Sequence, residues 1–257
     1  MKTRKATGID ADKGVISVDF IQKIAEGRRI TAVVGHFGSG KTEFCVSLAF
    51  ALASRGSGSL ALIDLDIANP YFRSREQKDS LEAAGISVYG SAYGTEITAE
   101  LPALDPAARA PLEDPSCRVI VDVGGDYSGA KILNQYTKYF KPGGHDLFCV
   151  INANRPETQS LDGAVNHLRA IEEQTSLKVT GLISNAHFVS FTQAEDVMEG
   201  YKLTAEVSRA TGIPVAAVCA REAIVDRVAA LRDRAGFDFD IMPVGLYMRA
   251  SWLDISL

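Results

Sequence analysis

Residues 35–42, G-H-F-G-S-G-K-T, combine residue types whose spacing suits the binding of a phosphate chain. Glycines allow backbone N–H groups to turn inward around phosphate oxygens. The ammonium group of Lys41 can reach the terminal phosphates, and the hydroxyl of Thr42 is a ligand that Mg²⁺ accepts. The pattern G-x-x-x-x-G-K-T therefore predicts a phosphate-binding loop.

The segments on either side of this loop have the composition that such a loop requires. Residues 30–34, I-T-A-V-V, are short, apolar and β-branched, as expected of a buried parallel strand. Residues 43–53 contain no Gly or Pro and predict a largely buried helix. The amino end of that helix would add its positive dipole end to the loop. The alternative, a glycine-rich turn without a ligand, leaves this agreement unexplained.

Acidic residues follow two other apolar segments of the chain. Asp64 and Asp66 close one segment and share a face of a strand, and Asp122 closes the other. Because ligands bind at the carboxyl ends of parallel strands, we expect Asp122 to anchor Mg²⁺ and the loop that begins at Asp64 to carry a residue that orients a water molecule. Gly125 completes a D-x-x-G pattern whose N–H could approach a terminal phosphate. Solvated acids and a tight turn are the simpler alternatives.

Strand-like and helix-like segments alternate along the chain. Strands are expected at residues 30–34, 60–63, 86–89, 118–121, 146–151, 179–184, 215–218 and 243–247. Helical patterns separate them, including an amphipathic one over residues 158–174. This alternation predicts an α/β fold with a mostly parallel sheet of about seven or eight strands and helices on both faces.

Length and composition predict one domain over residues 1–257, with an extension at 1–28 and an irregular, proline-containing insertion at 90–116. The net charge is −5 and no dense Lys/Arg run appears, so nucleic-acid binding is not expected. No segment approaches the ~20 apolar residues of a membrane span, and the basic start of the chain is not followed by the apolar core of a signal peptide. The four cysteines form no C-x-x-C pair, which argues against a zinc or iron–sulfur site and favours a cytoplasmic location.

The three loops together resemble those of the SIMIBI class of P-loop nucleotidases, and more closely the MinD/ParA (CobQ/CobB/MinD/ParA) family. The resemblance is carried by residues 35–42, 63–66 and 121–125. It implies ATP and Mg²⁺ as cofactors, ATP hydrolysis, Lys41 and Asp66 as catalytic residues, and Thr42, Asp66 and Asp122 around the metal. The nucleotide-binding residues that it implies are Gly35, His36, Phe37, Gly38, Ser39, Gly40, Lys41, Thr42, Glu43 and Asn185.

One departure from the family pattern concerns His36, which stands where the family has a signature lysine that reaches across a nucleotide-dependent dimer. His36 could act as a weaker donor, or Arg73 or Arg75 could supply the charge. The expected function is an ATPase switch that acts on a protein partner, with a nucleotide-dependent homodimer as one form. An ATP-dependent ligase or kinase of the synthetase branch, and a regulatory module with little hydrolysis, remain open. GTP is less expected because no [N/T]-K-x-D motif follows a late strand.

Overall fold

The computed structural model describes residues 19–56, 58–65, 75–90, 106–125 and 132–248. Eight strands form one sheet in the order β3-β2-β4-β1-β5-β6-β7-β8, and every neighbouring pair is parallel. The strands are β1 (Ile30–Gly35), β2 (Leu60–Leu65), β3 (Ile86–Tyr89), β4 (Arg118–Val123), β5 (His145–Ile151), β6 (Gly181–Ser184), β7 (Val215–Arg221) and β8 (Ile241–Val244). The α/β fold with a parallel sheet, predicted from the alternation of segments, is confirmed.

Strand β1 lies at the centre of the sheet, between β4 and β5. All six of its residues are buried, because helices cover both faces of the sheet. Its alternate residues contribute to different cores: Ala32 and Val34 pack on one face, and Val33 packs on the other. The chain runs outward from β1 in both directions, and a strand order that reverses in this way opens a crevice at the carboxyl ends of the strands.

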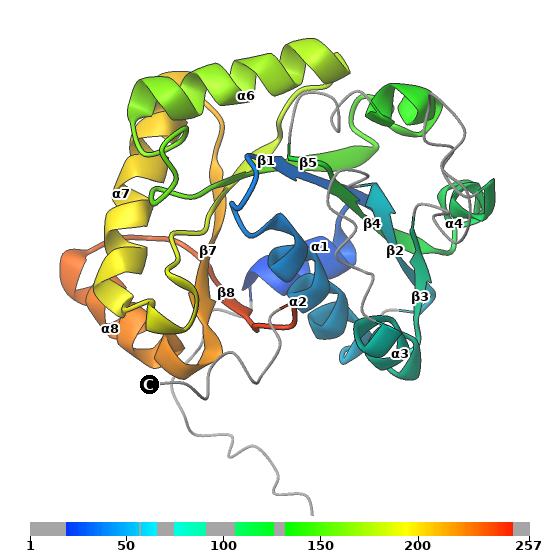
Figure 1. Cartoon of the computed structure of the whole chain (residues 1–257), viewed down its shortest axis with the longest axis horizontal. Coiled ribbons are helices and arrows are strands. Elements are labelled where there is room, and N and C mark those ends of the chain that lie inside the picture. The colour runs from blue at the N-terminus through cyan, green and yellow to red at the C-terminus, as the bar shows by residue number, and fades with distance from the viewer. Residues whose placement is uncertain (1–18, 57, 66–74, 91–105, 126–131, 249–257) are drawn as a thin grey trace, which may run out of the picture.

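The α-helices divide between the two faces of the sheet (Figure 1). Helices α1, α2 and α3 cover one face, and α6, α7 and α8 cover the other, where the short helix α4 also packs. Their bounds are α1 (Asp19–Glu26), α2 (Lys41–Ala53), α3 (Arg75–Ala83), α4 (Arg109–Glu113), α6 (Leu161–Thr175), α7 (Ala194–Thr211) and α8 (Val225–Ala235). The 3₁₀ helices are η2 (Pro106–Ala108), η3 (Ile132–Tyr139), η4 (Val189–Phe191) and η5 (Glu222–Ile224).

Helix α2 is the central helix of its face, and it is apolar almost all round rather than amphipathic. Leu48 and Leu52 are fully buried within it, and α1 and the end of β8 lie alongside. A helix that is hydrophobic on every side is stable only where other elements surround it. The buried position of α2 holds its first turn, and so the loop at residues 35–42, against the middle of the sheet.

The regions predicted as an N-terminal extension and as an irregular insertion both contain helices where they are described. The region predicted as an extension, 1–28, includes α1, whose Phe20 and Ile24 are buried. The predicted insertion, 90–116, ends in η2 and α4, and Leu112 of α4 is buried in the main core. Residues 91–105 lie outside the described residues. Among the described helices, none is long and apolar enough to cross a membrane.

The four cysteines are free and lie in the interior: Cys45 in α2, Cys117 just before β4, Cys149 in β5 and Cys219 in β7. Each side chain is at most 4% exposed.

Candidate functional site

The loop between β1 and α2 has the backbone conformation that its glycines make available. Gly35, at the end of β1, has φ 148°, and Gly38 and Gly40 have φ 72° and 87°, values that side chains other than glycine rarely adopt. The N–H of Ser39 donates to the carbonyl of His36 at 3.0 Å, which closes a tight turn. The N–H of Phe44 then donates to the carbonyl of Gly40 at 3.0 Å, so the helix begins at once.

Lys41 is buried at the mouth of this loop, with 5% of its surface exposed. Its Nζ donates to the carbonyl of His36 at 3.4 Å. Gly125, from the end of β4, lies against the same group: a Cβ added there would sit 2.7 Å from Lys41 Nζ and 2.8 Å from the backbone nitrogen of Phe37. Only glycine fits at this position, which brings the D-x-x-G segment into contact with the loop.

The side chains of Thr42 and Asp122 are joined by a hydrogen bond. The Thr42 hydroxyl donates to Asp122 Oδ2 at 2.6 Å, although 80 residues separate the two in sequence. Asp122 is 1% exposed, and its neighbour on β2 in the strand register is Asp64, which is 5% exposed. The predicted metal set therefore has Thr42 and Asp122 together, with Asp64 beside them. Asp66, the third residue of that set, lies outside the described residues.

Asp64 was not among the predicted metal ligands. The signal was present, because Asp64 is the first acid of the D-x-D pattern at the end of β2. Asp66 was assigned instead because the resemblance to the MinD/ParA family implies a role for the second acid of this pattern. A pair of buried carboxylates beside a threonine hydroxyl is an oxygen-rich environment of the kind that Mg²⁺ prefers.

Side chains from two other strand ends bind the carbonyl oxygens of the loop. Gly38 O accepts from Arg155 Nε at 2.8 Å and from Asn152 Nδ2 at 3.4 Å, and both residues follow β5. Ser39 O accepts from Asn185 Nδ2 at 2.8 Å, at the end of β6. These bonds fix the orientation of successive peptide groups by holding their oxygens. Arg155 and Asn152 were missed by sequence reasoning, since no local motif marks them.

Asn185 was expected to contact a base, and the structure shows its amide bound to the loop. A cavity of about 320 Å³ opens beside Gly40 and Asn185. The other lining residues are Glu43, His187, Val189, Arg221, Val244, Gly245, Leu246 and Met248. The cavity is therefore built from the start of α2, the segment that follows β6, the end of β7, and the end of β8 with the residues after it.

Glu43 forms one wall of this cavity and ties it to the end of the described chain. Its two carboxylate oxygens accept the N–H groups of Tyr247 and Met248, each at 2.8 Å. Burial raises the pKa of Glu43, and these two backbone bonds oppose the shift. Each oxygen of the carboxylate thus already accepts one backbone N–H group.

The ring of His36 contacts α6 and the loop that precedes it. Its Nδ1 lies 3.0 Å from the carbonyl of Phe37 and 3.5 Å from Glu157 Oε2, and its ring centroid is 5.4 Å from that of His167, edge to face. Burial, and next the nearby His36, lower the pKa of His167 from 6.5 to about 4. Of the two arginines considered as substitutes for the signature lysine, Arg73 and the side chain of Arg75 lie outside the described part of the chain.

The residues that are present fit a phosphate chain. The hydroxyl oxygen of Ser39 is buried and has no hydrogen-bond partner among the described residues, so it remains available to a ligand. Left-handed glycines, a buried lysine and the amino end of a 13-residue helix converge at the same place. Within the described ranges, no group of three His, Cys, Asp or Glu side chains is arranged as a ready-made metal site.

Comparison with family models and with curated proteins finds no match. Among solved structures, the chain is similar to the cell division protein FtsY of Thermotoga maritima, with 25% identity, 74% of this chain and 60% of that chain covered, and a TM-score of 0.49. It is similar to chloroplast FtsY of Physcomitrella patens, with 20% identity, coverage of 76% and 63%, and a TM-score of 0.48. It is also similar to FlhF solved with GTP and Mg²⁺, with 15% identity, coverage of 76% and 67%, and a TM-score of 0.48. The chain spans less than two thirds of either FtsY protein, and similarity at this level does not assign it to a family.

Proposed function

We propose that this protein binds a nucleoside triphosphate with Mg²⁺ and hydrolyses it, and that the nucleotide is ATP. One observation supports this above all: Lys41, Thr42, Asp122 and Gly125 come together at the carboxyl ends of β1 and β4, around a glycine loop that opens α2. A strand, a glycine loop and a helix, with an acid from the neighbouring strand, is the arrangement that phosphoryl-transfer sites use.

Each residue then has a distinct role. Lys41 binds the terminal phosphate oxygens, and the N–H groups of the loop bind the remaining ones. Thr42 and Asp122 hold the cation, which neutralises phosphate charge when bound. Gly125 brings its N–H close to the end of the phosphate chain. Asp66 remains the residue expected to orient the attacking water.

The cavity next to the loop is the proposed base site, and its polar groups favour adenine over guanine. Guanine presents two donor groups on its pairing edge, and an acidic side chain normally reads them. The acid that lines this cavity, Glu43, already accepts two backbone N–H groups.

A calorimetric titration with Mg·ATP and with Mg·GTP tests the assignment. Lys41→Ala removes charge-assisted bonds worth about 1.5–3 kcal/mol, so ATP affinity should fall at least about tenfold. Lys202→Ala, on the exposed face of α7, is the matched control and should bind as the wild type does. Unchanged affinity in Lys41→Ala would refute the phosphate site, and equal or tighter binding of GTP would refute the choice of ATP.

We further propose that the nucleotide acts as a switch for a partner protein, with self-association as one form of the switch. A regulatory module with little hydrolysis is the second candidate, because the ring of His36 is engaged by Glu157 and His167. A ring held in this way is not presented to a second molecule as the family's lysine is. Phosphate release with ATP saturating, measured with and without cell extract, separates the two candidates.

A further inference from the structure

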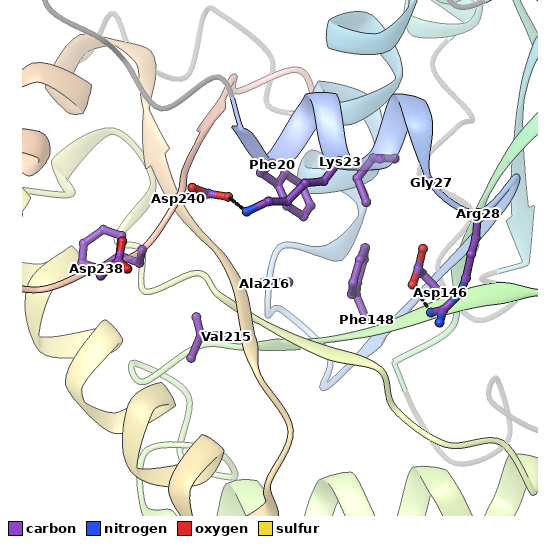
Figure 2. Close-up of a pocket in the computed structure, with 12 residues that line it drawn as sticks. Phe20, Lys23, Gly27, Arg28, Asp146, Phe148, Val215, Ala216, Asp238 and Asp240 are labelled. Carbon is purple, nitrogen blue, oxygen red and sulfur yellow. Dashed lines mark hydrogen bonds and ion pairs between the residues drawn. The ribbon is translucent and has the colours of Figure 1, made fainter. Parts of the chain in front are cut away.

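A second cavity lies at the amino ends of the strands, whereas the phosphate loop lies at their carboxyl ends. Its volume is about 490 Å³, within the range of small-molecule sites. Figure 2 shows it between α1, β5, β7 and the segment that leads into β8. None of its lining residues belongs to the site described above.

The floor of this cavity is apolar and includes two aromatic rings. Phe20 of α1 and Phe148 of β5 are 2% and 5% exposed, and their ring centroids are 5.9 Å apart. Val215 and Ala216 of β7 are only partly buried, so they offer additional apolar surface. A flat apolar group placed here would gain the usual free energy of burial.

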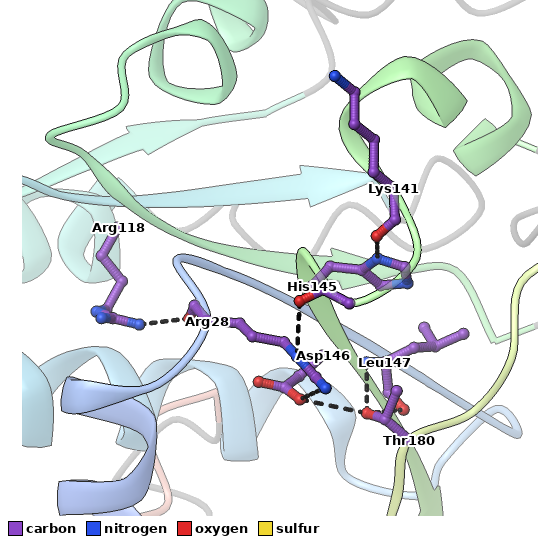
Figure 3. Close-up of polar contacts among 8 residues, drawn as sticks. Arg28, Arg118, Lys141, His145, Asp146, Leu147 and Thr180 are labelled. Carbon is purple, nitrogen blue, oxygen red and sulfur yellow. Dashed lines mark hydrogen bonds and ion pairs between the residues drawn. The ribbon is translucent and has the colours of Figure 1, made fainter.

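The two basic residues of the lining are already paired with acids. Lys23 Nζ lies 3.1 Å from Asp240 Oδ2, and Arg28 Nη1 lies 2.6 Å from Asp146 Oδ1, and the two pairs lie apart from each other in Figure 2. The second pair is firmly held, as Figure 3 shows: Thr180 Oγ1 also contacts Asp146 Oδ1, at 3.4 Å. In addition, Arg28 Nε donates to the carbonyl of Gly143 at 3.1 Å. Neither cation is free to receive an anionic ligand.

Asp238 is the third acid of the lining, and it leaves the cavity with one more negative than positive side chain. Its side chain is exposed, and among the described residues it forms no ion pair. Asp240 lies two residues away and pairs with Lys23. The rim near the start of β8 is therefore the negative part of the cavity, next to the apolar floor.

We propose that this cavity binds a small organic cation with an apolar body, an arylalkylamine in chemical class. The apolar body lies on Phe20, Phe148 and Val215, and the ammonium group faces Asp238 and Asp240. The negative charge selects the cation, while the floor supplies most of the affinity. The site is separate from the nucleotide site and does not depend on the proposed ATPase activity.

Three probes with the same phenethyl skeleton test this proposal: phenethylamine, phenethyl alcohol and hydrocinnamate, which are cationic, neutral and anionic. Nuclear magnetic resonance titrations of the full chain give an affinity for each probe. The amine should bind about fivefold more tightly than the alcohol, the acid should bind most weakly, and added salt should reduce the preference for the amine.

Two variants and one control complete the test. Asp238→Asn should weaken the binding of the amine and leave the binding of the alcohol unchanged. Glu206→Gln changes an exposed acid on α7 outside the cavity, and it should change the affinity for neither probe. Ala216→Phe should fill the floor and reduce the binding of all three probes, with thermal melting as the check on folding. Equal binding of the three probes, no binding by any, or an amine preference that persists in Asp238→Asn would overturn the proposal.

Discussion

The carbonyl oxygen of Gly38 must point away from the ligand, as in every phosphate-binding loop, because an oxygen that turned toward the phosphates would repel them. Arg155 Nε and Asn152 Nδ2 both donate to this oxygen, at 2.8 and 3.4 Å. A guanidinium is a planar, permanently charged donor, so it holds an oxygen in one direction. Arg155 is thus a positioning residue of the loop, acting through the backbone.

We predict that Arg155→Ala weakens ATP binding by about tenfold, the usual effect of losing a hydrogen bond to a charged group. Arg155→Lys should recover only part of the loss, because an ammonium lacks the planar geometry. Calorimetry checks both variants. Arg169→Ala, an exposed arginine of α6, is the control and should leave affinity unchanged. Wild-type affinity in Arg155→Ala would show that the loop keeps its shape without this bond.

The residues of the site differ in how visible they are in the sequence. Lys41 and Thr42 stand in a local motif whose spacing follows from the chemistry, and Asp122 ends an apolar strand. Arg155 acts on an atom 117 positions away in the chain, and nothing near it indicates which oxygen it will meet. Contacts of this kind depend on how β5 and β1 are paired, which the sequence alone does not reveal.

Among the elements, α6 carries an unusual buried group. His167 packs against the edge of His36 and is 6% exposed, and burial lowers its pKa to about 4. The charges that act on it are those of His36 and Lys41, which lower the pKa further, and that of Glu157, which raises it. A histidine that resists protonation in the folded protein favours the unfolded chain in acid.

The sign of this effect follows from counting protons. Between pH 6.5 and about 4, the unfolded chain binds a proton at His167 that the folded protein does not, so stability falls as pH falls through this window. Between neutral pH and pH 5 the loss should be about 2 kcal/mol. Urea unfolding of the wild type and of His167→Gln at both pH values measures it. The variant should lose about 2 kcal/mol less than the wild type on acidification, and an equal loss in both would contradict the assignment.

At the scale of elements, the sequence predicted well where apolar periodicity and breakers are strong. Helix α7 and the buried strands lie close to where the pattern indicated. The weaker predictions concern short elements: η2 and α4 were expected to be irregular because prolines surround them, yet the buried Leu112 draws α4 onto the sheet. Tertiary packing decided this segment, and packing is not visible in a local window.

For the molecule as a whole, the carboxyl ends and the amino ends of the parallel strands carry different chemistry, and they are called here the carboxyl edge and the amino edge of the sheet. The carboxyl edge gathers glycines, a lysine and acids at the ends of β1, β2 and β4. The amino edge has a cavity bounded by α1 and by the segment before β8, whose residues are scattered from 20 to 240 in the sequence. The first edge could be anticipated because its residues form motifs, and the second could not because they form none.

Chemical labelling of the four buried cysteines can report how often the interior of the folded protein opens. Only a thiolate reacts quickly with an alkylating reagent, and burial raises the pKa of Cys149 to about 12 and that of Cys45 and Cys219 as well. Labelling of the folded protein should therefore require local or global opening of the interior, so the labelling rate measures how readily the protein opens.

We predict that saturating Mg·ATP slows this labelling, by about 100-fold at a free concentration of 100 times the dissociation constant. Mass spectrometry of the labelled peptides follows each thiol separately. Cys45 lies behind the loop, and Cys219 lies in β7, three strands away from β1. Equal slowing at both thiols would mean that these two regions open together. Protection limited to Cys45 would mean that the neighbourhood of the loop opens by itself, and that ATP keeps closed only the part of the molecule that it touches.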